Sequence, residues 1–162
     1  MEQTYYLIII GALILEYSLS TVSSVFNMNS VSEDVPNGFQ DHYDEDKYAK
    51  SQAYLKDNTR FGLFSSTFSL VLTLIVIHTG LFGILDQFVR TQTVHPILSG
   101  LMYFGIIFII NDIINLPFSL YSTFVLEEKY GFNKTTSKTY VLDKLKGYTL
   151  TIVFGTIIMS PV

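Results

Sequence analysis

Three long apolar runs constrain the fold more than any other feature of this sequence. They cover residues 5–26, 61–88 and 97–116. A helix rises about 1.5 Å per residue, so each run is long enough to cross a hydrocarbon core of about 30 Å. Only 15% of the residues are charged, against roughly 25% in soluble domains. A chain in lipid must satisfy its backbone hydrogen bonds internally, so the runs predict an all-α integral membrane helical bundle.

The sequence predicts three complete spans and an incomplete fourth. We expect the third helix to continue past a kink at Pro117 to about residue 129, beyond the hydrocarbon. The fourth run, residues 148–162, reaches only about 23 Å at about 1.5 Å per residue. We therefore expect the sequence to be a fragment, or the product of a truncated gene, of a longer protein. The polar loops 27–60 and 117–147 are predicted to contain amphipathic helices, one of them over about residues 44–58.

Lysine and arginine are unevenly distributed between the loops. Loops 27–60 and 117–147 hold nine of these residues, whereas the loop between the second and third runs holds only Arg90. Cytoplasmic loops of membrane proteins carry the excess of positive charge. The bias predicts that loops 27–60 and 117–147 are cytoplasmic and that the N-terminus lies outside. Of the two membranes considered, we expect the bacterial cytoplasmic membrane rather than the endoplasmic reticulum.

Polar side chains recur on one face of each predicted span, all in its cytoplasmic half. An ionisable side chain facing lipid at the centre of a helix costs about 3 kcal/mol. The stripes therefore predict a hydrated cavity between the helices. In the alternative interpretation, the hydroxyl groups bond to neighbouring helices and Asp112 is a protonated or paired structural residue. The candidate lining residues are Glu16, Ser20, Ser69, Asn111, Asp112 and Asn115.

No catalytic or metal-ligating constellation is evident in the sequence. Cysteine is absent, which excludes disulfides and thiolate metal sites. The three histidines, His42, His78 and His95, lack metal-ligand spacing, and no HExxH string occurs. No basic stripe suggests a nucleic-acid partner. The sequence alone predicts a non-catalytic chain with no cofactor of its own.

One motif is more specific than the rest of the chain. It includes the string F-V-x-E-E-K-x-G-F-N, residues 124–133, and weaker similarity extends back through residues 50–54 and Phe61. This motif resembles the N-terminal membrane domain of the type 1 CAAX prenyl proteases. The residues that carry the signature are Tyr121, Phe124, Glu127, Glu128, Gly131, Phe132, Asn133, Asp143 and Lys146.

The resemblance implies a function that the composition does not. The family consists of integral-membrane zinc metalloendopeptidases with a water-filled chamber among their helices. Their zinc is held by the two histidines of HExxH and a downstream glutamate, which would all lie beyond Val162. Residues 1–162 would then be the N-terminal part of such an enzyme, with the candidate residues above lining its chamber. Residues 116–146 would brace the chamber's cytoplasmic rim against the catalytic segment.

The partners implied by the resemblance are the lipid bilayer, the missing C-terminal catalytic segment and a peptide or membrane-protein substrate. Two other functions remain open from the sequence. The chain could be a non-catalytic interaction or regulatory module of the membrane. It could also be a transport or proton-path element that uses Glu16 and Asp112, since ionisable residues within membrane helices are often functional.

Overall fold

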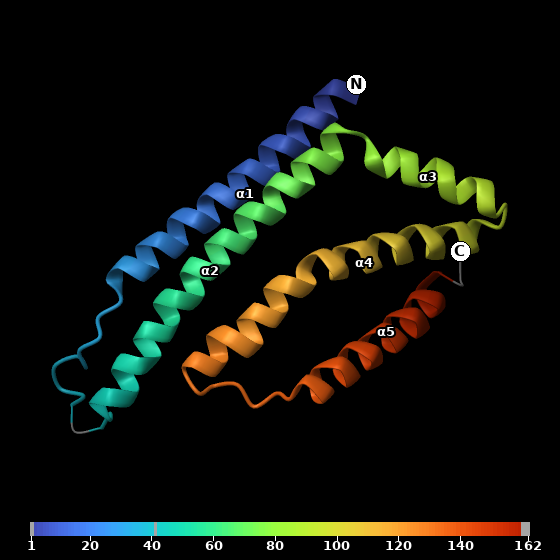
Figure 1. Cartoon of the computed structure of the whole chain (residues 1–162). Coiled ribbons are helices and arrows are strands. Elements are labelled where there is room, and N and C mark those ends of the chain that lie inside the picture. Colours follow the sequence, from blue (N-terminus) through green and yellow to red (C-terminus); the bar gives the residue numbers. More distant parts are fainter. Residues whose placement is uncertain (1, 41, 160–162) are drawn as a thin grey trace.

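The computed structural model describes residues 2–40 and 42–159, and within these ranges the chain is helical with no strand. The prediction of an all-α helical bundle is confirmed. Three helices are long and apolar enough to cross a membrane, namely Gln3–Ser30, Glu45–His78 and Pro96–Glu127. The elements in chain order (Figure 1) are α1 (Glu2–Ser30), α2 (Glu45–His78), α3 (Leu81–Gln92), α4 (Pro96–Tyr121), the π-helix η1 (Ser122–Glu127) and α5 (Ser137–Met159).

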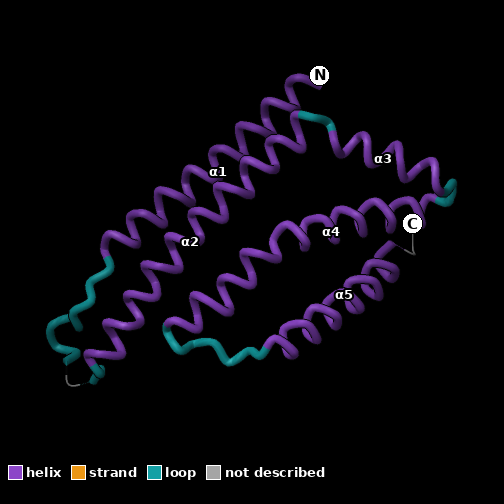
Figure 2. The backbone as a smooth tube through the Cα atoms, in the orientation of Figure 1, coloured by secondary structure: helices purple, strands orange, loops and turns teal. Residues whose placement is uncertain are grey.

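Helices α1 and α2 form an antiparallel pair that makes up one side of the molecule (Figure 2). Two side-chain contacts set its register. The Tyr17 hydroxyl lies 2.6 Å from Oγ1 of Thr67, and the Tyr6 hydroxyl lies 3.2 Å from Nδ1 of His78. Hydroxyl contacts of this kind satisfy polar groups that lipid cannot. His78 is therefore bonded to a neighbouring hydroxyl group.

Helix α2 differs from the predicted second span at both ends. The expected cytoplasmic helix and the span join into one helix that begins at Glu45, where Asp44 caps it by accepting a hydrogen bond from the backbone nitrogen of Lys47 at 3.1 Å. At about 1.5 Å per residue its 34 residues extend about 50 Å, far more than the hydrocarbon core. Its N-terminal part therefore has the length to project beyond the membrane.

The prediction that the second span continues to residue 88 is wrong. Helix α2 ends at His78, and Gly80 adopts a left-handed conformation with φ of 69° before α3 begins. An apolar run continues through this break, so hydropathy does not reveal it. Glycine lacks a Cβ and tolerates this backbone conformation, which allows the chain to turn within an apolar sequence. Helix α3 then leads away from α2 to the start of α4 (Figure 1).

Helix α4 returns toward α2 and approaches it at the end opposite α3 (Figure 1). It contains Pro117, which has no backbone N–H to donate to the preceding turn. Regular α-helical bonding ends at Tyr121, and η1 continues the same rod to Glu127. This widened turn brings the family-signature residues to the contact with α2. Phe118 packs there, with its ring centroid 5.0 Å from that of Phe68.

Helix α5 runs back along α4 and also differs from expectation. The predicted amphipathic helix and the fourth span are one helix, Ser137–Met159. Residues 160–162, the end of the predicted span, lie outside the described residues. The part that is described has 23 residues, and it is not among the three helices apolar enough to span.

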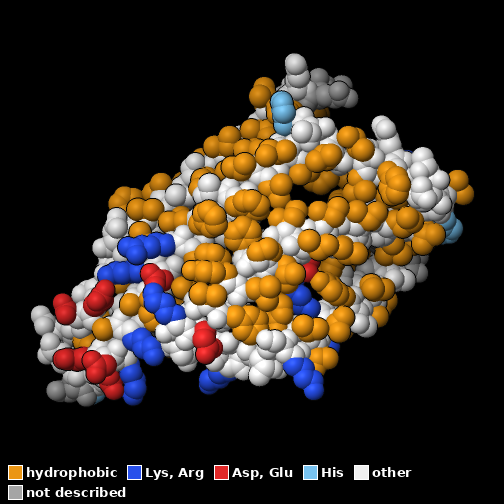
Figure 3. All heavy atoms as spheres, in the orientation of Figure 1, with side chains coloured by type: hydrophobic (Ala, Val, Ile, Leu, Met, Phe, Trp, Pro, Cys, Tyr) orange, Lys and Arg blue, Asp and Glu red, His pale blue; other side chains and the backbone are white. Residues whose placement is uncertain are grey.

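The molecule has very little interior. In the described part of the chain, the buried apolar residues are Val35, Val89, Leu126 and Tyr130. Hydrophobic side chains instead cover most of the surface in Figure 3, while charged side chains gather around the start of α2 and the start of α5. An apolar exterior of this kind is suited to contact with lipid or with further helices.

Candidate functional site

The signature turn after η1, residues 128–135, is anchored to α2 by Asp57. The Asp57 carboxylate accepts a hydrogen bond from Nζ of Lys129 and another from the Tyr130 hydroxyl, both at 2.6 Å. Tyr130 is buried, and Asp57 retains 27% of its side-chain exposure. Charge-assisted hydrogen bonds are stronger than neutral ones. The carboxylate therefore joins two segments that are more than 70 residues apart in the chain.

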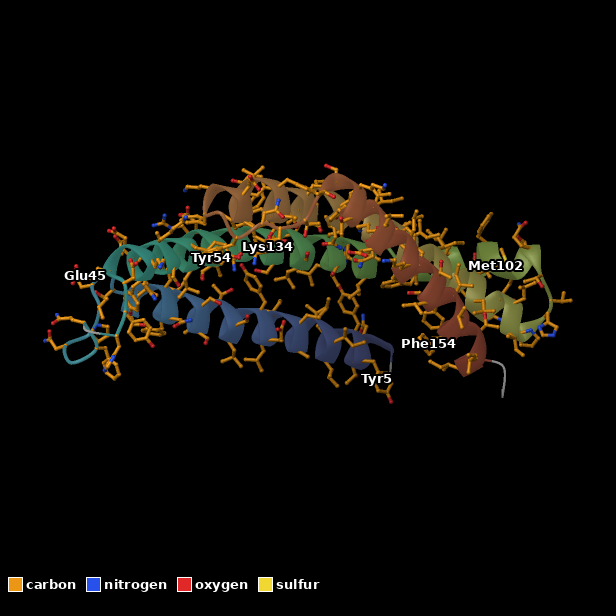
Figure 4. The ribbon with its side chains drawn as sticks, turned by 90° about the horizontal axis from the view of Figure 1, so that it is seen from below. Tyr5, Glu45, Tyr54, Met102, Lys134 and Phe154 are labelled. Carbon is orange, nitrogen blue, oxygen red and sulfur yellow. The ribbon has the colours of Figure 1, made fainter. Side chains whose placement is uncertain are left out.

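Aromatic side chains extend the same contact. Tyr54 packs edge-to-face on both Tyr130 and Phe132, with ring centroids 5.5 Å and 4.9 Å away. Phe61 packs against Tyr121 with centroids 4.8 Å apart. Figure 4 shows Tyr54 of α2 beside the segment that leads to Lys134. The two stretches that carry the sequence resemblance, around residues 50–61 and 121–133, therefore pack directly on each other.

The turn itself is held by its own backbone. Gly131 has a φ of 68°, and the backbone nitrogens of Phe132 and Asn133 both bond to the carbonyl of Glu127. Asn133 also accepts a hydrogen bond from the backbone nitrogen of Thr135 at 2.7 Å, and its amide donates to Glu128 at 3.1 Å. Glycine at a left-handed position and asparagine in a turn are the residues that such a helix end favours.

Lys129 and Tyr130, which donate to Asp57 from the signature turn, both have shifted pKa values. Donation to Asp57 raises the pKa of Lys129. The pKa of Tyr130 is also raised, first by its hydrogen bond to Asp57 and then by burial. Because the pKa values are raised, Lys129 stays charged and Tyr130 keeps its proton. Both side chains therefore remain hydrogen-bond donors. This arrangement stabilises the contact between the signature turn and α2.

A second polar cluster joins α4 to α5. The Asp112 carboxylate accepts hydrogen bonds from Nζ of Lys144, at 2.5 Å, and from the Tyr148 hydroxyl. The side chains of Asp112 and Lys144 are 23% and 25% exposed. One helical turn away from this pair, the Tyr140 hydroxyl donates to Oγ of Ser119 at 2.8 Å. Pairing with Lys144 satisfies the charge of Asp112, which would be costly if it faced lipid within the spanning helix α4. Asp112 is thus a paired residue.

The other five candidate chamber-lining residues make no contact of this kind between helices in the part of the chain that the structure describes. Asn115 donates to Oδ1 of Asn111 at 3.0 Å, so these two lie together on α4. Glu16, Ser20 and Ser69 are exposed and make no side-chain hydrogen bond within the described residues. Three of the six candidates therefore lie on α4. No hydrogen bond among the described residues joins them to the candidates on α1 and α2.

The other signature residues have local partners. Phe124 packs edge-to-face on Tyr140 with ring centroids 5.6 Å apart. Asp143 pairs with Lys146 at 3.3 Å within one turn of α5. Both side chains of this pair are more than 60% exposed, and such surface pairs contribute little to stability.

Sequence reasoning missed three residues that these contacts depend on: Asp57, Lys144 and Tyr148. For α5 a signal was available, because Tyr140, Lys144 and Tyr148 recur every four residues and share one helical face. The charge distribution along the chain shows Lys144 only as one of the positive charges of loop 117–147. Asp57 carries no local signal, because its partners come from a distant part of the chain.

The described residues do not fit a zinc site. Within residues 2–40 and 42–159, no group of three or more histidine, cysteine, aspartate or glutamate side chains lies close enough to hold a metal. Asp57 and Asp112 each neutralise a lysine instead. The chemistry that the contacts support is the positioning of helices.

Comparison with known proteins identifies what these helices belong to. A family model described as the CAAX prenyl protease N-terminal region, with five membrane helices, matches residues 25–162. The chain belongs to this family. Its helices also resemble the crystal structure of S. mikatae Ste24p with a TM-score of 0.85 and 29% identity, over 96% of this chain and 38% of that one.

Two curated relatives come from yeasts. A probable CAAX prenyl protease 1 from Schizosaccharomyces pombe is 36% identical over 136 residues, covering 75% of this chain and 28% of the relative. CAAX prenyl protease 1 from Saccharomyces cerevisiae is 30% identical over 160 residues, covering 92% of this chain and 35% of the relative. The chain thus spans about a third of the length of these relatives.

The expectation of a bacterial cytoplasmic membrane is wrong. The similar proteins are eukaryotic, from yeasts, a nematode, mouse and human among others. They point to a eukaryotic membrane, and three helices of spanning length agree with a multi-pass protein. The error arose because charge bias reports the side of a membrane and carries no information about which membrane it is.

Proposed function

We propose that this chain is the scaffold and part of the chamber wall of a CAAX-type zinc metalloendopeptidase, which hydrolyses peptide bonds of membrane-associated substrates. The observation that carries the proposal is the docking of the signature turn onto α2. Asp57 receives both Lys129 and Tyr130 from that turn. In the proposed enzyme, zinc would be held by a further segment of the protein, and this chain would position that segment.

The distribution of the contacts supports the proposed scaffold role. One polar cluster joins α2 to the signature turn, and the other joins α4 to α5 through Asp112. Each cluster links different helices, and each contains an aspartate bonded to a lysine and a tyrosine. The pairing of Asp112 favours this role over a proton path, because a carboxylate held by an ammonium group and a hydroxyl group is less available to carry a proton.

A chimera tests the scaffold role directly. The matching segment of the Saccharomyces cerevisiae relative is replaced by this chain, and hydrolysis of a prenylated CAAX peptide is measured in membranes that lack other CAAX protease activity. We expect activity in the chimera, severe loss with Asp57→Ala, and no change with Asp86→Ala, which breaks an exposed ion pair within α3 and outside the signature. A chimera that reaches the membrane at the normal level, binds zinc and cleaves no peptide would refute the proposal and favour a non-catalytic interaction module.

A second experiment tests the chamber wall. The chain has no cysteine, so single cysteines at Glu16, Ser69 and Asn115 can be probed with a water-soluble thiol reagent in the chimera. Matched controls are Leu15→Cys and Ile113→Cys, which replace apolar residues that are both 61% exposed on the same helices. We expect reaction at the three polar positions and protection of both controls in the membrane. Equal protection of all five positions would rule out the proposed cavity.

A further inference from the structure

A groove runs between α2 and η1 on the surface of the molecule. It consists of two adjoining hollows of about 340 Å³ and 390 Å³, which share Phe61, Phe64 and Tyr121. One end of the groove is lined by Asp57, Arg60 and Lys129. We call this the α2–η1 groove. The other end is lined by aromatic side chains and Pro117. The lining of the groove therefore changes from charged to apolar along its length.

The charged end carries an excess of positive charge, with two cations against one carboxylate. Arg60 lies 3.7 Å from Asp57, beyond hydrogen-bond distance, and its side chain is 68% exposed. Lys129 has three N–H donors, of which the described structure uses one on Asp57. Both cations therefore retain donors for an anion, and a phosphate group can accept from both.

The rest of the groove is apolar and accessible. Phe64 is 63% exposed, Val125 is 50% exposed and Tyr121 is 46% exposed. From Asp57 to Phe64 the groove follows α2 for about 10 Å, at about 1.5 Å per residue. Phe61 and Tyr121, which line both hollows, pack against each other with ring centroids 4.8 Å apart. Such a surface offers a path for one hydrocarbon chain.

The position of the charged end matches a membrane surface. Arg60 directly precedes the apolar run that begins at Phe61, and the positive charges of loops 27–60 and 117–147 predict that this end faces the cytoplasm. The cytoplasmic leaflet carries the anionic lipids, and basic pockets between membrane helices at that depth bind their headgroups. Charge, apolar lining and predicted depth therefore all match one class of ligand.

We propose that the α2–η1 groove binds an anionic glycerophospholipid of the cytoplasmic leaflet. Arg60 and Lys129 hold the lipid phosphate, and one acyl chain lies along Phe64, Tyr121 and Val125. The bound lipid seals the groove beside the contact that anchors the signature turn. This site goes beyond the proposed scaffold role, because it requires neither zinc nor a chamber.

Native mass spectrometry of the purified chain tests the proposal with equimolar phosphatidylserine and phosphatidylcholine in detergent. We expect the wild type to retain phosphatidylserine preferentially. Arg60→Gln combined with Lys129→Gln should weaken phosphatidylserine binding about thirtyfold, and Arg60→Gln alone about fivefold, from the usual contribution of a cation near a lipid surface. Arg60→Gln breaks no hydrogen bond to Asp57, so it serves if the double variant unfolds.

Matched controls separate the groove from general charge. Lys47→Gln combined with Lys146→Gln removes two exposed cations, each paired with an aspartate outside the groove, and should leave phosphatidylserine binding within about twofold of wild type. Val125→Trp fills the apolar path without a charge change and should weaken binding of both lipids. Equal loss in the two double variants, no loss in either, no effect of Val125→Trp, or displacement of the lipid by inorganic phosphate would each overturn the proposal.

Discussion

Replacing Asp57 with alanine removes the carboxylate that bonds the signature turn to α2. This carboxylate accepts from Lys129 and from Tyr130 at 2.6 Å, and the alanine variant leaves both donors without this partner. Tyr130 is largely buried, so its hydroxyl has less access to water than the exposed Lys129 ammonium group. The aromatic contacts of Tyr54 and Phe61 with the signature segment remain in this variant.

The expected loss follows from the burial of each donor. A hydrogen bond to a charged group contributes about 1.5–3 kcal/mol, and most of the loss should come from the buried Tyr130. Lys129 is 61% exposed, so it adds only the small contribution of a surface ion pair. We therefore expect Asp57→Ala to lower the free energy of unfolding by about 2–3 kcal/mol.

Equilibrium unfolding of the purified chain by titration from mild detergent into sodium dodecyl sulfate measures this change. A double-mutant cycle with Tyr130→Phe isolates the pair, and we expect a coupling energy of about 1–2 kcal/mol. Asp143→Ala is the matched control, because it breaks an exposed aspartate–lysine pair within a single helix. If Asp57→Ala costs no more than Asp143→Ala, or if the coupling energy is zero, the anchoring role is wrong.

Three further predictions concern the other contacts. Asp112→Ala should destabilise the chain by about 3 kcal/mol, because it leaves Lys144 unpaired between helices, and Asp112→Leu with Lys144→Leu should recover most of this loss in the same titration. Gly131→Ala should cost about 1–2 kcal/mol because φ is 68° there, whereas Gly62→Ala in the middle of α2 should stabilise slightly. The hydrogen bond from the backbone nitrogen of Lys47 lowers the pKa of Asp44. The cap that Asp44 forms on α2 should therefore be complete above the ordinary pKa of 3.8 and be lost as the pH falls through the lowered pKa of the folded chain. The hydrogen-exchange protection of the first-turn amides, measured relative to an unfolded peptide at the same pH, should fall at low pH in the wild type and should not change with pH in this way in Asp44→Asn.

The helical fold was predictable from the sequence, and so was the presence of three helices apolar enough to cross a membrane, although not their ends. Apolar runs of membrane length are a local property, and each can be recognised without knowing what surrounds it. The end of this helix at Gly131, within the signature, also has a local signal, since glycine is the residue that most readily adopts the positive φ favoured at a helix C-terminus. The family resemblance rested on the same local string.

The break at Gly80 could not be predicted from the apolar run around it. Hydropathy sums the character of side chains, whereas the break depends on one backbone dihedral. Hydropathy also predicts a boundary at residue 60 that the structure does not have. The charged stretch before it and the apolar run after it form one helix, because backbone hydrogen bonds within a helix form both in water and in lipid.

The sequence by itself therefore determined which segments are helical and which can lie in lipid, because backbone hydrogen bonding and side-chain transfer act over short stretches of chain. Only the tertiary structure decided which polar residues meet. Asp57 finds its partners more than 70 positions away, and Asp112 finds Lys144 32 positions away. The energy of a charged side chain in a membrane protein depends on what lies within a few ångströms of it, and that neighbourhood is created when the helices pack.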